Sequence, residues 1–275
     1  MLRRFSTNIV DTVAADGTYA RALTGFVAPA IVTVRQREPA AIAVEVDATP
    51  GEDARALAVV RRMLGTDRSL TRFDRGARKI EWLRALAVRM RGVKPPRYPT
   101  LWEACVNAVV FQQVSIISAS AMLRRTILAL GEPVQHAGIA LYAFPEPAAF
   151  LAASDAALRT AGLSAAKVAT LRRIADALLA GSIDEAMLEE RASPDAVALL
   201  CGIKGIGAWT AAVILLRGLG RLDVFPMNDS GVARSIAALA GGSVDVPTAL
   251  ALLGDERGML YYHLLLARLE VRGDV

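Results

Sequence analysis

The residues with the clearest capacity for chemistry lie between Leu199 and Asp229, in the stretch LLCGIKGIGAWTAAVILLRGLGRLDVFPMND. Two glycines, Gly205 and Gly207, separate two apolar runs with helical spacing, and glycine allows both a tight turn and a close approach by another backbone. The helix that follows would present unpaired N–H groups and a positive dipole end, which suit a phosphate. Asp229 places a carboxylate shortly after this phosphate site. The combination favours an enzyme that acts on DNA, although Gly-x-Gly between two helices is by itself more often an ordinary turn.

The residues around the two glycines have separate expected roles. Ile203 and Ile206 would anchor the hairpin in the core, whereas Lys204 would lie at its tip and contact a phosphate. Asp229 admits two interpretations. It could be only the N-cap of a following helix, or it could stabilise the positive charge that develops on a sugar when a glycosidic bond breaks.

Composition and charge limit the class of protein. The chain has 275 residues, of which 54% are hydrophobic and 21% charged, so it can bury a substantial core. Its formal net charge is +5, and basic residues gather between Arg61 and Lys94, which fits either a polyanionic partner or a solvated helical face. Cys105 and Cys201 offer neither a disulfide framework nor zinc-binding spacing, and we expect both thiols to be free and buried. Because we find neither a signal-peptide core nor an apolar run of membrane length, we expect a cytoplasmic protein without membrane contact.

The elements that must position these residues begin with a mixed α/β segment. Runs of β-branched residues predict strands at 30–34 and 41–46, joined by a polar connection at 35–39. Helical spacing follows at 52–64. We therefore expect residues 1–95 to form a small N-terminal α/β domain, with an antiparallel sheet and helices.

Residues 96–275 are expected to form the second domain. A linker at 92–99 spans the boundary between the two domains, and the pattern after Thr100 is helical almost throughout. Ser193, Pro194 and Asp195 form a strong helix start, with Ser193 as the N-cap. The expected helices cover residues 101–130, 146–151, 155–161, 165–179, 193–202, 207 to 218 or 220, 230–240 and 258–271.

Several strings in this helical part resemble the helix-hairpin-helix (HhH-GPD) DNA glycosylase superfamily, and its 3-methyladenine DNA glycosylase II branch in particular. That family carries a hairpin of the form Pro-Gly-Ile-Gly-x-Trp-Thr-Ala, then Asp-x-Phe-Pro with a catalytic Asp three residues after the proline. The corresponding strings here are GIGAWTA and DVFPMND, and WEACVNAVVFQQVSIISASA contains the family's Gln-Gln-Val-Ser turn. Leu163–Lys167 is similar to the family's Gly-Leu-Ser-x-x-Lys step.

The resemblance covers about residues 98–270 and implies a mostly α fold with a two-lobed helical core. One lobe would run from Leu101 to about Asp229. The other would combine the C-terminal helices with residues before Thr100. The amino-terminal segment is a looser match to the small α/β domain that precedes this core in the same branch.

The resemblance also implies roles for individual residues. Asp229 takes the position of the catalytic Asp. Such enzymes flip a nucleotide out of the duplex, and Gln113, beside Gln112, is the candidate to fill the gap, although both glutamines could merely satisfy a turn. The residues implied to line the base pocket are Trp209, Val213, Ser230, Phe111 and Tyr261. The residues implied to contact DNA are Gln112, Gln113, Ser115, Lys167, Ile203, Lys204, Gly205, Ile206, Gly207 and Thr210.

The implied activity is hydrolytic and monofunctional. Relatives with lyase activity carry a Lys where this chain has Trp209, and a Trp cannot form a Schiff base. We expect removal of alkylated bases such as 3-methyladenine and 7-methylguanine, whose positive charge an indole face can bind. The implied partner is double-stranded DNA with damaged bases, bound by a monomer. The chemistry needs no cofactor and no catalytic metal, and the resemblance implies a monovalent cation at the hairpin when DNA is bound.

Two alternatives stay open. Val213 and Ser230 stand where well-studied members have aromatic residues, so the substrate could instead be a deaminated or oxidised base. The other alternative is a helix–hairpin–helix protein that binds DNA without catalysis. Asp229 argues against it, because an inert binder has no need for a carboxylate that repels DNA phosphates.

Overall fold

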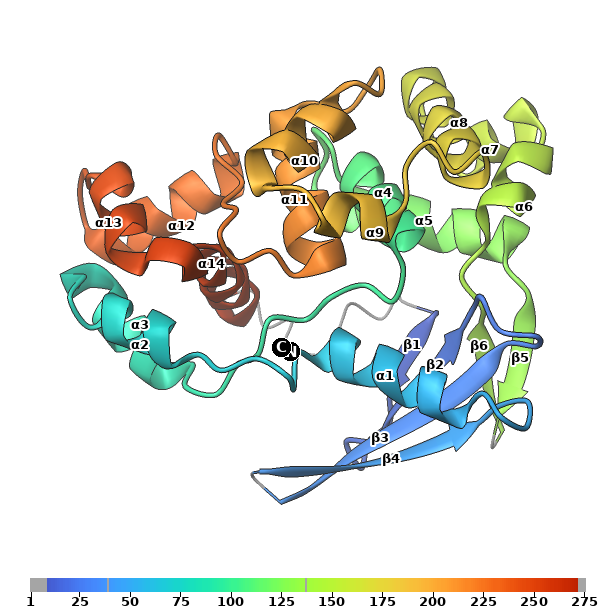
Figure 1. The fold of residues 1–275 in the computed structure, drawn as a ribbon, viewed down its shortest axis with the longest axis horizontal. Helices are drawn as coiled ribbons and strands as arrows, with labels where there is room; N and C mark the ends of the chain where they lie inside the picture. Colours follow the sequence, from blue (N-terminus) through green and yellow to red (C-terminus); the bar gives the residue numbers. More distant parts are fainter. Residues whose placement is uncertain (1–8, 39, 137, 272–275) are drawn as a thin grey trace.

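The structure, a computed structural model, describes residues 9–38, 40–136 and 138–271, and Figure 1 shows their arrangement. A four-stranded antiparallel sheet in the order β1-β2-β3-β4 lies at one side of the molecule, and helices form most of the remainder. This is the mostly helical architecture with an amino-terminal sheet that the sequence predicts. The strands of the sheet are β1 (Asp11–Val13), β2 (Tyr19–Leu23), β3 (Ala30–Glu38) and β4 (Ala41–Asp47).

Both predicted strands are present, but the sheet is larger than the sequence indicates. The prediction of a polar connection from Arg35 is wrong, because β3 continues to Glu38 and Arg35 pairs with Ala43 of β4. β1 is only three residues long, and all five residues of β2 are buried. Neither strand therefore shows the alternation of polar and apolar residues by which a strand is recognised.

Helix α1 (Asp53–Leu64) confirms the predicted helix and covers one face of the sheet (Figure 1). Its buried residues Ala56, Val60 and Met63 pack with Tyr19 and Val32 of the sheet in one hydrophobic cluster. The apolar spacing in the sequence thus corresponds to the face that is removed from water.

The predicted run 101–130 is two helices, α4 (Leu101–Val110) and α5 (Ile116–Leu130). Each begins at a hydroxyl N-cap, since the side chain of Thr100 accepts from the backbone of Glu103 and that of Ser115 accepts from Ser118. All ten residues of α4 are buried. The five-residue connection between the two helices is the segment with the Gln-Gln-Val-Ser string, and we call residues 111–115 the α4–α5 loop.

A second hydrophobic cluster surrounds α4 with the following helices of the chain. It includes Val109, Leu171, Leu200 and Ile214. A two-stranded hairpin that the sequence analysis does not predict precedes these helices. The elements of this part are β5 (Pro133–His136), β6 (Ile139–Tyr142), α6 (Pro147–Ala152), α7 (Asp155–Thr160), α8 (Ala165–Leu179), α9 (Glu185–Glu189), α10 (Ser193–Cys201) and α11 (Ala208–Ile214).

Local details of this part differ from the sequence prediction. The N-cap of α10 is Ala192, and Ser193 is the first helical residue. The thiol of Cys105 is buried as predicted, whereas Cys201 is exposed. Helix α11 continues directly into a π-helix, η1 (Leu215–Leu219), which ends at Gly220 in the left-handed conformation. Such wide turns are rare and occur often at functional sites.

A third cluster joins the C-terminal helices to two helices from before the linker (Figure 1). Phe73 and Leu83 from the earlier pair pack with Ile236, Leu250 and Tyr262. The predicted helices 230–240 and 258–271 are confirmed, whereas α2, α3 and α13 are not predicted. The elements are α2 (Thr71–Ala77), α3 (Glu81–Arg89), α12 (Ser230–Ala240), α13 (Val246–Leu253), η2 (Gly254–Glu256) and α14 (Gly258–Val271).

The division of the chain into two domains at residue 95 stays a prediction. Within the described ranges, no helix has the length and apolar character needed to cross a membrane.

Candidate active site

A cavity of about 1090 Å³ lies between the α4–α5 loop, the hairpin before α11, the start of α12 and one side of α14. Most residues that the sequence analysis assigned to a site lie on its wall. Lys167, Ile203, Lys204 and Ile206 are not among the lining residues. The predicted residues that do line the cavity are Asp229, Trp209, Val213, Ser230, Phe111, Tyr261, Gln112, Gln113, Ser115, Gly205, Gly207 and Thr210.

Asp229 is both the N-cap of α12 and a half-buried carboxylate on the cavity wall. Its Oδ1 accepts hydrogen bonds from the backbone N–H groups of Gly231 (2.7 Å) and Val232 (2.9 Å). Its Oδ2 accepts one from the indole Nε1 of Trp209 at 3.0 Å. The two interpretations of this residue are therefore compatible, because the capping bonds fix the carboxylate in place while it remains on the cavity wall.

Trp209 connects α11 to the start of α12. Its side chain is half-buried and packs against the cluster around α4. The bond to Asp229 was not foreseen from the sequence, which assigned the indole to the base pocket alone. Because this bond uses the edge of the indole, both roles can coexist, and contact with a base stays a prediction.

The two glycines of the hairpin have different physical requirements. Gly205 has φ +105°, and a Cβ there would lie 1.9 Å from the hydroxyl oxygen of Thr170 on α8. Gly207 has φ −98°, and a Cβ there would meet nothing within 4 Å. The fold therefore requires glycine at position 205, whereas the open surface at 207 is free for the approach of a ligand.

The remaining hairpin residues lie as the sequence predicts. Ile206 is buried and Ile203 packs against the cluster around α4, while Lys204 is exposed. The carbonyl oxygens of Lys204 and Gly205 accept one hydrogen bond each, from Arg173 and from Gln112. A carbonyl oxygen has two lone pairs, so the hairpin keeps acceptor capacity for the expected monovalent cation, which stays a prediction.

The α4–α5 loop is tied to the hairpin by Gln112. The Gln112 amide nitrogen donates to the hydroxyl of Thr210 at 2.7 Å and to the carbonyl of Gly205 at 3.1 Å. Lys167 holds the loop from the other side, since its ammonium donates to the carbonyls of Val110 (2.6 Å) and Gln112 (3.0 Å). Burial lowers the pKa of Lys167. These polar groups bind protein atoms in the structure, and any contact of Gln112, Lys167 or Thr210 with DNA stays a prediction.

Gln113 differs from Gln112 in both conformation and exposure. It is exposed and has φ +55°, which is uncommon for a residue other than glycine. Such a backbone conformation persists only where the surrounding structure holds it. Here the bonds of Gln112 and Lys167 hold the loop, so the strained backbone presents the Gln113 side chain at the cavity.

Several cavity residues were missed by the sequence analysis, and most of them are arginines. The lining includes Arg124, Arg217, Arg234 and Arg268, against Asp229 as the one carboxylate among its described residues. The guanidinium of Arg217, in the π-helix, lies over the ring of Tyr98 at 4.8 Å. Arginines scattered over 145 positions give no motif, so only the folded chain brings them together.

Gly231 allows Arg268 to pack against the start of α12. A Cβ at position 231 would lie 2.1 Å from Nη1 of Arg268 and 3.0 Å from Oδ1 of Asp229. The guanidinium of Arg268 is thus near the carboxylate of Asp229. Arg268 follows Tyr261 by seven positions on α14, a spacing of two helical turns that the sequence could have shown.

Tyr261 contributes a neutral hydroxyl to the same wall. Burial raises the pKa of Tyr261 to about 12, while the nearby charge of Arg217 acts in the opposite direction. The described part of the chain gives this hydroxyl no hydrogen-bond partner. At neutral pH it therefore remains a potential donor toward the cavity.

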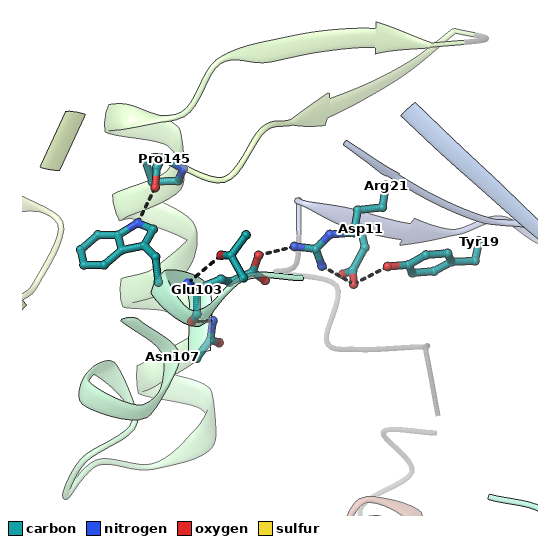
Figure 2. A network of polar contacts seen from close by, with 8 residues as sticks. Asp11, Tyr19, Arg21, Glu103, Asn107 and Pro145 are labelled. Carbon is teal, nitrogen blue, oxygen red and sulfur yellow. Dashed lines mark hydrogen bonds and ion pairs between the residues drawn. The ribbon is translucent and has the colours of Figure 1, made fainter. Parts of the chain in front are cut away.

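A buried ion-pair network connects the amino-terminal sheet to the first turn of α4 (Figure 2). The guanidinium of Arg21 contacts Glu103 at 2.5 Å and Asp11 at 3.2 Å, and the hydroxyl of Tyr19 also donates to Asp11. Burial by itself lowers the pKa of Arg21, but the charges of Glu103 and Asp11 raise it above its ordinary value. The guanidinium of Arg21 therefore stays charged, and its contacts with Glu103 and Asp11 fix α4 to the sheet.

Comparisons with known proteins agree with this geometry. A family model described as "HhH-GPD superfamily base excision DNA repair protein" matches residues 106–249. A DNA-3-methyladenine glycosylase of Bacillus subtilis (strain 168) is 29% identical over 175 residues, which are 63% of this chain and 57% of that protein. DNA-3-methyladenine glycosylase 1 of Schizosaccharomyces pombe is 31% identical over 132 residues, 48% of this chain and 54% of that protein.

A similar solved structure is the 3-methyladenine DNA-glycosylase from Archaeoglobus fulgidus. It superposes with a TM-score of 0.80 at 26% identity, over 93% of this chain and 88% of that one. The chain spans about half the length of the curated relatives it matches.

Proposed function

Because this chain belongs to the HhH-GPD superfamily of base excision DNA repair proteins, we propose that it is a monofunctional DNA glycosylase. It would flip alkylated bases, of the 3-methyladenine and 7-methylguanine type, out of double-stranded DNA and hydrolyse the glycosidic bond. The product is an abasic site. The observation that carries the proposal is the carboxylate of Asp229, held on the cavity wall by three hydrogen bonds.

The proposed chemistry follows from the position of that carboxylate. Departure of the base leaves positive charge on the sugar, in an oxocarbenium-like transition state. A carboxylate whose orientation is fixed in advance stabilises this charge without having to reorganise. The N–H donors at the start of α12 and the indole of Trp209 supply that fixed orientation.

The proposed binding of DNA uses the open surface of the hairpin and the α4–α5 loop. Gly207 and the start of α11 would contact a phosphate, and exposed Lys204 would add a charge. Gln113 would occupy the space that the flipped nucleotide leaves, which lowers the cost of holding the base in the cavity.

The absence of strand cleavage rests on Trp209. This residue has no amine, so it cannot form the Schiff base on which a lyase reaction depends. Alkylated bases of this type are good leaving groups because they carry positive charge, and hydrolysis needs little assistance at the base.

A second candidate is a glycosylase for a deaminated or oxidised base. The observation in its favour is the charge of the cavity wall, where arginines outnumber the single described carboxylate. Fixed positive charge disfavours a cationic base and favours a neutral base that carries hydrogen-bond acceptors.

One experiment tests both candidates. Duplexes with single alkylated, deaminated or oxidised bases are incubated with the protein, and the released base and the state of the strand are measured. The main proposal expects release of alkylated bases and an intact strand that breaks only in alkali. Release confined to neutral deaminated or oxidised bases would favour the second candidate, and strand cleavage with a borohydride-trapped intermediate would contradict the monofunctional assignment.

A further inference from the structure

One face of α4 connects the amino-terminal sheet to the cavity. Glu103, Asn107 and Phe111 follow one another at intervals of four residues, which places them on one side of the helix and its end. Glu103 contacts Arg21 of the sheet, as Figure 2 shows, whereas Phe111 and Asn107 line the cavity. Asn107 is therefore the polar residue at which the ion-pair network meets the cavity.

The side-chain amide of Asn107 has a fixed orientation. Its nitrogen donates to the backbone carbonyl of Glu103 at 2.9 Å. A rotation of the amide by 180° would place its oxygen against that carbonyl oxygen, so the hydrogen bond fixes the positions of the amide nitrogen and the amide oxygen. The amide oxygen of Asn107 accordingly points away from Glu103.

This oxygen has no partner in the described part of the chain. Asn107 is only 5% exposed, and the remaining residues of α4 are buried with it. Among the described residues, the fully enclosed side-chain nitrogens and oxygens without a partner are all arginine Nε atoms, so the oxygen of Asn107 is not sealed from the cavity that this residue lines. A buried polar group without a partner is costly, and a polar side chain at this position is explained if a molecule in the cavity completes its bonding.

Three neighbouring polar groups on the cavity wall bind atoms of the protein itself, in contrast to the hydroxyl of Tyr261. The hydroxyl of Thr210 accepts from Gln112, the indole N–H of Trp209 donates to Asp229, and the hydroxyl of Tyr262 donates to backbone carbonyls. The Asn107 oxygen is thus an acceptor that a flipped base can reach without breaking a bond of the protein.

We propose that Asn107 is a specificity-determining residue whose amide oxygen accepts a hydrogen bond from an N–H group on the edge of the flipped base. This inference rests on the glycosylase function proposed above. The substrates it favours are bases that keep such a donor, for example the amino group of 3-methyladenine. A base such as 1,N6-ethenoadenine, in which a two-carbon bridge replaces the N–H groups, leaves the oxygen unpaired.

The test compares these two bases in the wild-type protein and in Asn107→Leu, which keeps the size of the side chain and removes the acceptor. Single-turnover release of 3-methyladenine should fall about 10- to 100-fold, since a site that hydrogen-bonds its substrate discriminates strongly. Release of 1,N6-ethenoadenine should stay the same or rise. An equal fall for both bases, or no change for either, would overturn the proposal.

Val109→Ala is the matched control. Val109 is buried in the same helix but does not line the cavity, so this variant should affect both bases equally. If Asn107→Leu does not fold, which circular dichroism would show, Asn107→Ala takes its place with the same expected difference between the two bases.

Measuring the binding of the free bases distinguishes a failure of this proposal about Asn107 from a failure of the proposed glycosylase function. Equilibrium dialysis measures the affinities of wild-type protein and Asn107→Leu for 3-methyladenine and 1,N6-ethenoadenine. If the wild-type protein releases no base from any duplex, the glycosylase function fails. In that case, weaker binding of 3-methyladenine alone by the variant would still support Asn107 as the residue that recognises the N–H group of the base. Unchanged binding of both bases would overturn this proposal.

Discussion

Helices α12 and α13 begin in the same way, with an aspartate as the N-cap. Asp229 accepts hydrogen bonds from the backbone of Gly231 and Val232, and Asp245 accepts them from the backbone and the hydroxyl of Thr248. The surroundings of the two carboxylates differ. Asp229 is half-buried on the cavity wall and receives a third bond from Trp209. Asp245 is exposed, and among the described residues its side chain accepts hydrogen bonds only from Thr248, in its own first turn.

The comparison distinguishes helix capping, which a local sequence pattern explains, from the orientation of a carboxylate by a distant residue, which depends on packing. Either aspartate is explained by helix capping alone. Only Asp229 has a partner 20 positions away in the chain, and that partner is carried by the helix of the hairpin. If the proposed function holds, the chemical role belongs to the carboxylate that long-range packing orients.

The largest expected effect comes from removing the charge of Asp229, and the same substitution at Asp245 is its matched control. Asp229→Asn should reduce base release about 1000-fold, because it removes the stabilisation of the sugar cation. Affinity for DNA should be equal or higher, since a negative charge near the phosphates is lost. Asp245→Asn should leave base release unchanged. Equal effects of the two substitutions in single-turnover assays would show that capping, and not chemistry, is the role of Asp229.

A smaller effect is expected from crowding the start of α12. The Cβ added by Gly231→Ala would meet Arg268 and Asp229, and displacement of a catalytic group by about 1 Å can cost about 100-fold in rate. The matched control is Gly242→Ala, whose Cβ would meet nothing within 4 Å. Base release by Gly231→Ala at wild-type level would mean that the position of the carboxylate tolerates more movement than we infer.

Removing the third bond should have a more modest effect. Trp209→Phe keeps an aromatic ring and loses the donor to Asp229, and a hydrogen bond to a charged group contributes about 1.5–3 kcal/mol. Because Asp229 is only half-buried, we expect a fall in kcat of about 10-fold. Trp82→Phe, at a half-buried Trp that packs with the C-terminal helices, controls for the loss of an indole. An effect on KM alone would assign Trp209 to binding of the base and not to Asp229.

The smallest effect concerns the stability that Asp245 provides. Hydrogen bonds from the hydroxyl and the backbone of Thr248 lower the pKa of Asp245. An acid with a lowered pKa stabilises the folded state above its unfolded pKa, and this contribution is lost as the pH falls through the folded pKa. Asn caps a helix about as well as Asp, so the difference in Tm between wild type and Asp245→Asn reports the charge. It should be constant from pH 7 to 5, begin to shrink near pH 4, which is about the unfolded pKa, and disappear as the pH falls through the lower pKa of the folded state. A difference that does not change with pH would contradict this origin.

The sequence predicts the helical part well because its helices are long and one-sided in their apolar residues. The predictions for α1 and α8 agree with the structure for this reason, whereas α14 is recognised by the length of its apolar run, because its residues are buried on nearly all sides. β2 was missed because its residues are buried on both faces. Apolar spacing alone extends one helix across residues 101–130, and only the resemblance to the family indicates the turn at the Gln-Gln-Val-Ser string after Val110.

The site was predictable where a motif is contiguous and unpredictable where it depends on contacts between distant segments. The string from Gly205 to Asp229 identified the hairpin and the carboxylate. It did not distinguish Gly205, which Thr170 requires, from Gly207, which has open space before it. The bond from Trp209 to Asp229 and the place of Asn107 on the cavity wall likewise arise only when the helices pack.

Gln112 has a consequence for how such chains can change in evolution. Its amide joins the α4–α5 loop to the hairpin through Thr210 and Gly205, so one side chain serves two surfaces that lie 93 to 98 positions apart in the chain. A replacement of the amide at position 112 leaves the buried hydroxyl at position 210 without its donor. Positions 112 and 210 should therefore vary together among homologues, and a hairpin transplanted from a relative should work best when it is moved with the loop that it evolved beside.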